Sequence, residues 1–256
     1  GKYWYCTLTK AKKEVGDVFR YFAHAMEKAG VDVRLKTEFS RDMLDEIKPD
    51  ILIDATGAEF KKPDIEGINL PIVVTPTEAL DGSKELGEYV VVVACSYNCT
   101  WTCRKVSKDI PDDIVGMKTS ESYACSAGHA AADVAEELAD QGKKVCIITG
   151  RDEFVPGMGF TNRGNMLKRY FQKNITVSTG LKVKQIIPGG LICEKEGMEF
   201  KVCADSIVMS VGMDSSSHIK NQAEEFGCAF YQIGDCAAIG NALKAFHGAY
   251  DLSGMI

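Results

Sequence analysis

The sequence predicts an α/β protein in which helices connect the strands of a mostly parallel β-sheet. Apolar strand patterns alternate with amphipathic helical patterns along most of the chain. Residues 90–93 are four consecutive valines, which is typical of a strand buried on both faces of a parallel sheet. Residues 51–54 and 229–233 are further short apolar segments, and each is followed by a turn that contains glycine. These observations indicate crossover connections between neighbouring parallel strands.

The first part of the chain is predicted to form a helix over residues 14–29. Its apolar side chains recur at helical spacing on one face, and they are Val15, Val18, Phe19, Phe22 and Met26. Gly30 is a natural end for this helix. We then expect a strand over 31–35, a helix over 41–47 and a strand over 51–54.

Residues 60–82 contain three prolines and several glycines without a clear period, so we interpret them as a connection between two lobes. The second lobe is predicted to begin with a strand over 90–94. A polar segment that contains cysteine follows, from Cys95 to about Ser122. We then expect a helix over 126–139, ending before Gly142.

The remaining elements follow the same reasoning from periodicity. We expect a strand over 144–149, a helix over 164–173 and extended chain over 176–187. Residues 190–211 have the pattern of a β-meander that closes on a strand over 206–211. The chain ends with a strand over 229–233, a turn at Gly234-Asp235 and a helix over about 241–252.

Composition limits the classes of partner. The 256 residues can form one large domain or two modest ones, and 45% of them are hydrophobic. A net charge of -6 favours neither nucleic acid nor anionic lipid. The sequence has no run of about 18 apolar residues that could span a membrane, and no signal-peptide pattern at its start, so we expect a cytoplasmic protein. The ten cysteines are expected to be reduced thiols.

Two short motifs carry most of the functional information. Ala55-Thr56-Gly57 follows an apolar strand, and glycine there permits close approach of the backbone to a cofactor. Ile233-Gly234-Asp235 follows another strand near the end of the chain. Each motif has a structural alternative, because a glycine can form a plain turn and Asp235 can be a turn residue or a helix cap.

Together with four longer segments, these motifs resemble the C-terminal region of the old-yellow-enzyme-related NADH:flavin oxidoreductases, which include 2,4-dienoyl-CoA reductase, 2-enoate reductase and trimethylamine dehydrogenase. The segments are EVGDVFRYFAHAMEKAGVDVRL, KPDILIDATGAE, DSIVMSVGM and FYQIGDCAAIGNALKAFHGAY. The strand at Val90 with the helix at 126–142 also matches. The resemblance covers nearly the whole chain.

The resemblance implies two Rossmann-like three-layer lobes of the glutathione-reductase type. Residues 1–82 and 213–256 would form a partial FAD-type lobe, and 83–212 an inserted NAD(P)-type lobe that contains the insert at about 95–122. The FAD lobe would lack its N-terminal βαβ start, which carries a G-x-G-x-x-G turn in the family. We therefore expect weak or absent FAD binding by this chain alone.

The resemblance also assigns candidate cofactor residues. Thr56, Gly57, Gly234 and Asp235 would contact FAD, with the Asp235 carboxylate on the ribityl chain. In the inserted lobe the family's glycine-rich turn is missing, and small residues remain at the helix start, where they could still admit a nucleotide. These are Ser126, Ala127 and Gly128.

Two further residues belong to the same expected nucleotide site. Gly212 would lie near the cofactor where the chain returns to the first lobe. Arg151 follows a strand at a position where a contact with a 2'-phosphate would favour NADPH, or it is a solvated surface arginine.

Four cysteines with close spacing raise the possibility of a metal site. Cys95, Cys99 and Cys103 form a C-x3-C-x3-C run, and Cys125 follows later. Four thiolates could hold zinc or an iron-sulfur cluster, but this spacing is not a standard metal motif. The same spacing is consistent with the buried face of a short helix or with a redox-active pair.

The expected role is electron entry in a longer enzyme. Electrons from NAD(P)H would pass via FAD, through a 4Fe-4S cluster, to an FMN-bearing barrel that reduces a small unsaturated organic substrate. FMN and the cluster belong to the absent N-terminal part, which is the expected partner, and no catalytic residue is expected here. The alternative is a non-catalytic scaffold lobe that holds ADP or nothing. The oligomeric state stays open.

Overall fold

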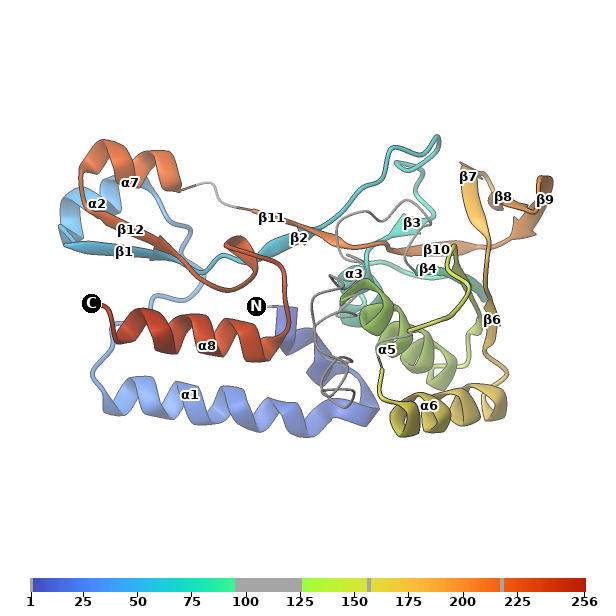
Figure 1. Ribbon diagram of the computed structural model, residues 1–256, viewed down its shortest axis with the longest axis horizontal. Helices are drawn as coiled ribbons and strands as arrows, with labels where there is room; N and C mark the ends of the chain where they lie inside the picture. The colour runs from blue at the N-terminus through green and yellow to red at the C-terminus, as the bar shows by residue number, and fades with distance from the viewer. Residues whose placement is uncertain (1, 95–125, 156–157, 217–218) are drawn as a thin grey trace, which may run out of the picture. The chain divides into compact units, whose positions relative to one another are not determined.

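The computed structural model describes residues 2–94, 126–155, 158–216 and 219–256, and it divides the chain into two compact units (Figure 1). Unit 1 consists of Gly1–Glu59 and Asp214–Ile256, and unit 2 of Phe60–Met213. The divisions fall within β2 (Ala58–Phe60) and β11 (Met213–Ser215), which pair with each other as a two-stranded sheet.

Unit 2 is built on a five-stranded sheet in which every pairing is parallel. In spatial order its strands are β3 (Val73–Val74), β10 (Ser206–Ser210), β4 (Tyr89–Ala94), β5 (Lys144–Thr149) and β6 (Thr176–Ser178). The valine strand β4 lies in the middle, where Val91 is level with Ile207 on one side and Cys146 on the other. Residues 90–94 are at most 2% exposed, as expected for a strand covered on both faces.

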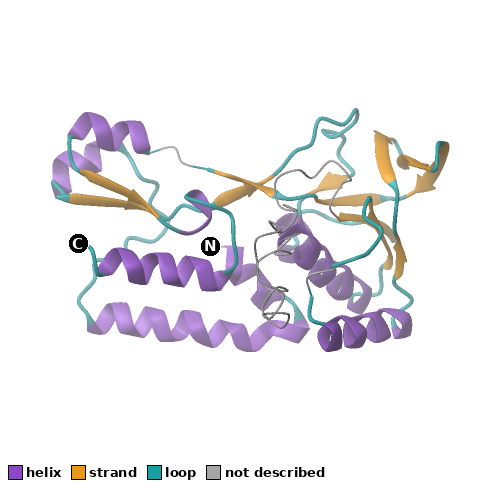
Figure 2. Ribbon diagram, viewed as in Figure 1, coloured by secondary structure: helices purple, strands orange, loops and turns teal. Residues whose placement is uncertain are grey.

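Each face of this sheet has its own hydrophobic core. Val90, Val92 and Ala94 pack into a cluster with residues of the helices, which are α3 (Pro76–Asp81), α5 (Ser126–Asp140) and α6 (Phe160–Gln172). Val91 and Val93 point to the opposite face, because side chains alternate along a strand. Figure 2 shows the resulting layers of helix and sheet within unit 2.

The second face is covered by an antiparallel sheet of three strands, β7 (Lys182–Ile187), β8 (Gly190–Lys195) and β9 (Met198–Cys203). The predicted meander over 190–211 is thus only partly correct. Its last strand, β10, pairs in parallel with β3 and β4. The buried residues Ile207, Val208 and Met209 explain the difference, because such a continuous apolar run suits the central sheet.

The lobe boundary near residue 82 was predicted from the lack of a period in 60–82, and the structure groups these residues with unit 2. They contain β3 and α3, which the sequence analysis missed. The signal for α3 was present as a capping box. The Thr75 hydroxyl accepts a hydrogen bond from the Glu78 backbone, the Glu78 carboxylate accepts one from the Thr75 backbone, and Pro76 begins the helix.

Unit 1 contains a parallel pair of strands, β1 (Ile51–Asp54) and β12 (Ala229–Gln232). Figure 1 shows α2 (Arg41–Ile47) and α7 (Lys220–Phe226) on one side of this pair and α8 (Ala242–Ser253) on the other. The remaining helices of the unit are α1 (Gly16–Lys28) and the 3-10 segments η1 (Lys2–Leu8), η2 (Lys10–Val15) and η4 (Gly234–Cys236). Phe22 of α1 stacks on Phe246 of α8 at 5.9 Å between ring centroids.

The predicted strand over 31–35 does not form, which corrects the sequence analysis. Val31, Val33 and Leu35 are all exposed. A strand needs a neighbour for its backbone groups, and no strand among the described residues pairs with this segment. The alternation of apolar residues is therefore typical of a strand, but no described strand lies beside it to pair with its backbone.

The α/β fold with a parallel, Rossmann-like sheet is confirmed. The helices predicted over 41–47 and 126–139 and the strands over 51–54 and 144–149 form within one residue of their expected limits. In the part of the chain that the structure describes, no helix is long and apolar enough to cross a membrane.

Candidate functional site

The two predicted motifs lie at the same edge of the unit 1 strand pair. β1 and β12 run in parallel with Asp54 level with Gln232, so their carboxyl ends meet. The Ile233 backbone N–H donates to the Asp54 carbonyl at 3.0 Å, just beyond the last register pair. Ala55-Thr56-Gly57 and Gly234-Asp235 follow these strands directly. Ligands of parallel α/β sheets bind outside the carboxyl ends of the strands.

Asp54 holds the first of these turns in place. Its side chain is fully buried, at 0% exposure. One carboxylate oxygen accepts hydrogen bonds from the Thr56 backbone N–H at 3.0 Å and the Thr56 hydroxyl at 2.7 Å, and the other accepts one from the Gln232 amide at 3.4 Å. The sequence analysis missed this residue, although an ionisable side chain at the end of an apolar strand was a visible signal.

Gly57 keeps the turn open for a ligand. Its φ of +89° lies in the left-handed region that favours glycine, and no atom lies within 4 Å of the position that a Cβ would take. The Gly57 carbonyl accepts hydrogen bonds from the Ser216 backbone and hydroxyl at 3.2 and 3.3 Å. The backbone is thus fixed on one side and open on the other.

The Asp235 carboxylate combines a structural contact with a potential ligand contact. One oxygen accepts a hydrogen bond from the Gly240 backbone at 3.0 Å, and the Asp235 carbonyl accepts one from the Ser215 hydroxyl at 2.7 Å. Among the described residues, the second carboxylate oxygen accepts no hydrogen bond. One carboxylate oxygen thus acts as in the predicted alternative of a turn residue. The other can accept a hydrogen bond from a hydroxyl group of a ligand.

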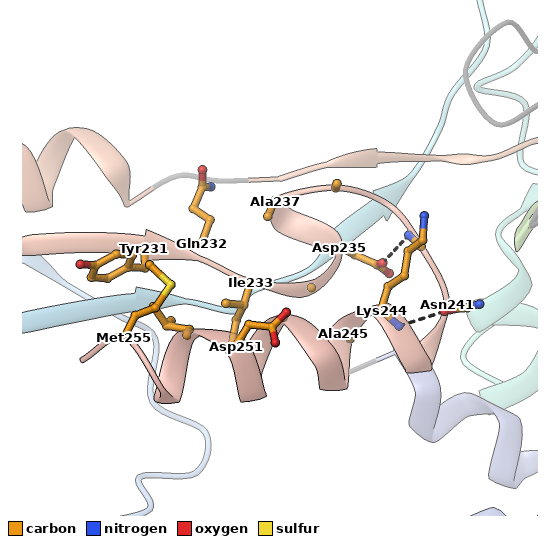
Figure 3. Close-up of a pocket in the computed structure, with 15 residues that line it drawn as sticks. Tyr231, Gln232, Ile233, Asp235, Ala237, Asn241, Lys244, Ala245, Asp251 and Met255 are labelled. Atoms are coloured by element: carbon orange, nitrogen blue, oxygen red, sulfur yellow. Dashed lines mark hydrogen bonds between the residues drawn. The ribbon is translucent and has the colours of Figure 1, made fainter. Parts of the chain in front are cut away.

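Two cavities of unit 1 share Asp235. The first has a volume of about 380 Å³ and is lined by Lys2, Trp4, Tyr5, Ala55, Thr56, Gly57, Ala58 and Asp235. The second, of about 340 Å³, lies between β12 with η4 and helix α8, as the side chains in Figure 3 show. Both volumes fall in the range of ligand-binding pockets, roughly 300–1,000 Å³.

The second cavity is bordered by the start of α8. The Asn241 side chain caps this helix by accepting a hydrogen bond from the Lys244 backbone at 3.0 Å (Figure 3). Lys244 and Asp251 contribute charged groups to the lining, while Ile233, Ala245 and other residues make much of it apolar.

A buried thiol joins the two strand ends. The Cys236 Sγ lies 3.0 Å from the carbonyl oxygens of both Asp54 and Ile233, so it can donate to either. Cys236 is 4% exposed. We assign it to the support of the two turns.

The Lys2 side chain places a positively charged ammonium group at the first cavity. Partial burial lowers the pKa of the Lys2 ammonium, although the nearby carboxylates of Glu59 and Asp235 act in the opposite direction. The sequence analysis gave no role to Lys2, Trp4 or Tyr5, because they belong to no motif and lie far from residue 235 along the chain.

The candidate residues of unit 2 gather at the carboxyl edge of its parallel sheet. Ala94, Thr149 and Ser210 are level with one another at the ends of the three central strands. Arg151 follows β5, where its carbonyl accepts a hydrogen bond from Gly180 at 2.8 Å. Gly212 follows β10 with a φ of +122° and open space at its Cβ position.

Ser126, Ala127 and Gly128 are the first residues of α5, so their backbone N–H groups belong to the first turn of that helix. The predicted metal candidates Cys95, Cys99, Cys103 and Cys125 lie outside the described residues. Among the residues that the structure describes, no cluster of His, Cys, Asp and Glu could hold a metal ion.

Comparison with known families agrees with this arrangement. A family model described as pyridine nucleotide-disulphide oxidoreductase matches residues 24–249, which is most of the chain. The chain belongs to this family. It is accordingly a Rossmann-like FAD/NAD(P)-binding domain of the oxidoreductase type.

Curated relatives of this family member are much longer proteins. An NADH oxidase from Thermoanaerobacter brockii is 24% identical over 90% of this chain, which spans 32% of that protein. A bilirubin reductase from Mediterraneibacter gnavus is 24% identical over 88% of this chain, which spans 30% of its length. The chain thus corresponds to about a third of these proteins.

Solved structures with the same fold include a 2-naphthoyl-CoA reductase, with a TM-score of 0.82 and 22% identity over 100% of this chain and 34% of the other. A histamine dehydrogenase from Rhizobium sp. 4-9 has a TM-score of 0.75 and 15% identity over 99% of this chain and 38% of the other. At these identities the likeness supports the fold.

Proposed function

We propose that this chain is the dinucleotide-binding portion of a longer flavin-dependent NAD(P)H oxidoreductase. The observation that carries the proposal is the meeting of Thr56-Gly57 and Gly234-Asp235 at one edge of β1 and β12, next to a cavity of about 380 Å³. Family membership supports a flavin and a nicotinamide cofactor.

The residues present fit the FAD that the family implies. The open space at Gly57 allows a cofactor to approach the backbone closely, and the second Asp235 oxygen would accept a hydrogen bond from a ribityl hydroxyl. Thr56 and Gly234 complete the two turns. A bound flavin would supply two-electron redox chemistry, while these residues bind and orient it.

The nicotinamide nucleotide would bind at the carboxyl edge of the unit 2 sheet. The first turn of α5, Arg151 and Gly212 follow the strands that end there. Helix N-termini favour phosphate groups, and Arg151 would favour the 2'-phosphate of NADPH. The choice between NADH and NADPH depends on whether this arginine contacts the ligand.

The longer enzyme would also contain an N-terminal barrel with FMN and a 4Fe-4S cluster, and would reduce a small unsaturated organic substrate. This part of the proposal rests on the resemblance of the motifs to old-yellow-enzyme-related enzymes. The names of the relatives, which include reductases and dehydrogenases of organic molecules, support it.

The alternative is a scaffold lobe that holds ADP or no ligand. Two observations favour it. The sequence has no G-x-G-x-x-G turn, and the described sheet of unit 1 has only the two strands β1 and β12. Both weaken the expected affinity for FAD.

Calorimetric titration of the purified chain with FAD, NADH, NADPH and ADP separates the two proposals. We expect weak FAD binding that Asp235→Asn reduces about tenfold, because a hydrogen bond to a charged acceptor contributes roughly 1.5–3 kcal/mol. Glu225→Gln, which removes an exposed carboxylate on α7, is the matched control and should bind normally. Binding of ADP alone, or of no nucleotide, would favour the scaffold.

A further inference from the structure

The 380 Å³ cavity beside Thr56 and Gly57 has a second wall that belongs to neither motif. Lys2, Trp4 and Tyr5 of η1 form this wall. They lie at least 50 positions before Thr56 in the chain, and the fold brings them to the same cavity.

The two walls differ in chemistry. The motif wall consists of backbone and small side chains, since Ala55, Gly57 and Ala58 line it. The second wall has two aromatic rings, and those of Trp4 and Tyr5 meet edge to face at 5.6 Å between centroids. A cavity lined by both backbone and aromatic side chains can accept a planar ring.

Trp4 is not used in packing the core. It is 46% exposed and contacts Tyr5, while the neighbouring Tyr3, which is 40% exposed, contacts Phe19 of α1 at 5.8 Å between ring centroids. An indole that stays half exposed beside a cavity retains apolar surface for a ligand to cover.

Two charged side chains line the cavity. Lys2 offers an ammonium group, and Asp235 offers the carboxylate oxygen that makes no hydrogen bond among the described residues. The ligand is therefore expected to combine a flat conjugated ring with polar edge atoms and hydroxyl groups. A flavin has all three features.

We propose that Trp4 stacks on the isoalloxazine ring of the flavin nucleotide and that Lys2 contacts the polar edge of that ring. Lys2, Trp4 and Tyr5 then form the ring-binding wall of the site, Thr56 and Gly57 line the motif wall, and Asp235 accepts a hydrogen bond from the ribityl chain. This inference rests on the proposed function, because it assumes that the motif pair binds a flavin.

Nuclear magnetic resonance of the indole N–H groups tests the stacking at the weak affinities expected here. The chain has two tryptophans, Trp4 and Trp101, so the spectrum has two indole signals, and Trp101→Phe assigns the signal of Trp4. FAD and riboflavin should shift the Trp4 signal, because both carry the isoalloxazine ring. ADP, which lacks that ring, should leave it in place.

Affinity provides a second readout by calorimetry. Trp4→Ala should weaken FAD binding about 3- to 10-fold, the usual effect of a lost aromatic stack. Trp4→Phe, which keeps a ring, should recover most of this loss. Tyr3→Ala is the matched control, because it removes a neighbouring exposed ring that does not line the cavity.

The outcomes separate this inference from the proposed function. If FAD binds but the Trp4 signal does not move, or if Trp4→Ala and Tyr3→Ala bind FAD equally well, the ring-binding wall is wrong and the FAD site stands. A shift caused by ADP but not by riboflavin would assign the cavity to adenine and overturn the inference. If neither FAD nor riboflavin binds, the FAD site of the proposed function fails for this chain and the inference fails with it.

Discussion

At the scale of single residues, the Asp54 carboxylate explains how a short turn can be held rigid at the end of β1. A buried carboxylate is costly unless hydrogen bonds compensate it, and Asp54 accepts them from Thr56 and Gln232. Thr56 is a predicted cofactor contact, and Gln232 belongs to the neighbouring strand β12. One side chain thus couples the turn to the sheet.

Asp54→Ala should therefore lower the free energy of unfolding by about 3 kcal/mol, because it removes a buried carboxylate that accepts three hydrogen bonds. Urea unfolding measures the change. Asp50→Ala, which removes an exposed carboxylate just before β1, should change stability by less than about 0.5 kcal/mol. Equal effects of the two substitutions would show that the Asp54 hydrogen bonds do not hold the turn.

Cys193 makes unit 2 sensitive to high pH. The thiol is fully buried, and burial, with a smaller effect of Cys146, raises its pKa from 9.0 to about 11. Between these two values the unfolded chain has lost the proton and the folded chain has kept it. The stabilisation is complete below pH 9 and is lost as the pH rises through the folded-state value.

We expect the free energy of unfolding to fall between pH 9 and about 11, and Cys193→Ala to make this fall shallower. Unfolding curves across that range provide the measurement. Cys203→Ala removes an exposed thiol of the adjacent strand and should leave the slope unchanged. Burial also raises the pKa of Tyr170, which adds to the fall at the upper end, so the comparison between variants is decisive.

The sequence was sufficient to select Thr56, Gly57, Gly234 and Asp235 as candidate cofactor contacts, because short motifs after apolar strands can be recognised without a structure. The structure places these four residues together, and their contacts with FAD stay predictions. Asp54, Lys2 and Trp4 were missed because their significance depends on neighbours distant in the chain. Gln232, for example, is 178 residues from Asp54.

At the scale of elements, hydrophobic periodicity located helices and strands whose partners lie within the chain. The strand over 144–149 forms as predicted, with Val145, Ile147 and Ile148 buried, and the helix over 41–47 forms with Leu44 buried. The same reasoning failed for residues 31–35, where the pattern is present and no neighbouring strand is described. Strand formation is a property of the pair, so a single sequence cannot guarantee it.

The turn at Gly67 shows how closely the connection 60–82 packs in unit 2. Its φ is +85°, and a Cβ there would collide with the Ile186 carbonyl on β7. The Ile186 backbone N–H in turn donates to the Glu66 carbonyl at 2.8 Å. The connection is therefore part of the unit 2 core rather than a free linker.

Gly67→Ala should destabilise the protein by about 3 kcal/mol or more, since it combines backbone strain with a clash against backbone atoms. Gly82→Ala is the matched control. Gly82 also has a positive φ, of +71°, but nothing lies within 4 Å of its Cβ position, so only the conformational cost of about 1 kcal/mol remains. Thermal unfolding compares the two, and similar losses would argue against tight packing at Gly67.

At the scale of the whole molecule, the two units differ in how well their strands are paired. In unit 2, β4 has a hydrogen-bonded neighbour on each side and a hydrophobic core on each face. In unit 1, β1 and β12 pair only with each other among the described strands. Large apolar side chains of unit 1 also remain exposed, namely Tyr21, Phe22, Val31, Val33, Leu35, Leu243, Phe246 and Tyr250.

This difference predicts unequal local stability within one chain. Parallel strands depend on burial on both faces and on neighbours at both edges, so a pair of strands alone is marginal. Amide protons exchange with solvent through local opening, and the rate reports the free energy of that opening. We expect the backbone amides of β4 and β5 to exchange at least about tenfold more slowly than those of β1 and β12, a difference of about 1.4 kcal/mol.

Hydrogen-deuterium exchange of the purified chain provides this comparison directly. Asp54→Ala should accelerate exchange in β1 and β12 and leave β4 and β5 unchanged, because its hydrogen bonds lie wholly within unit 1. FAD should slow exchange in the two turns at Thr56 and Gly234 if it binds there, since a ligand that binds only the closed state stabilises that state. Equal protection of all four strands, with or without FAD, would show that the pair β1–β12 is as stable as the five-stranded sheet and would remove the structural reason for expecting weak FAD binding.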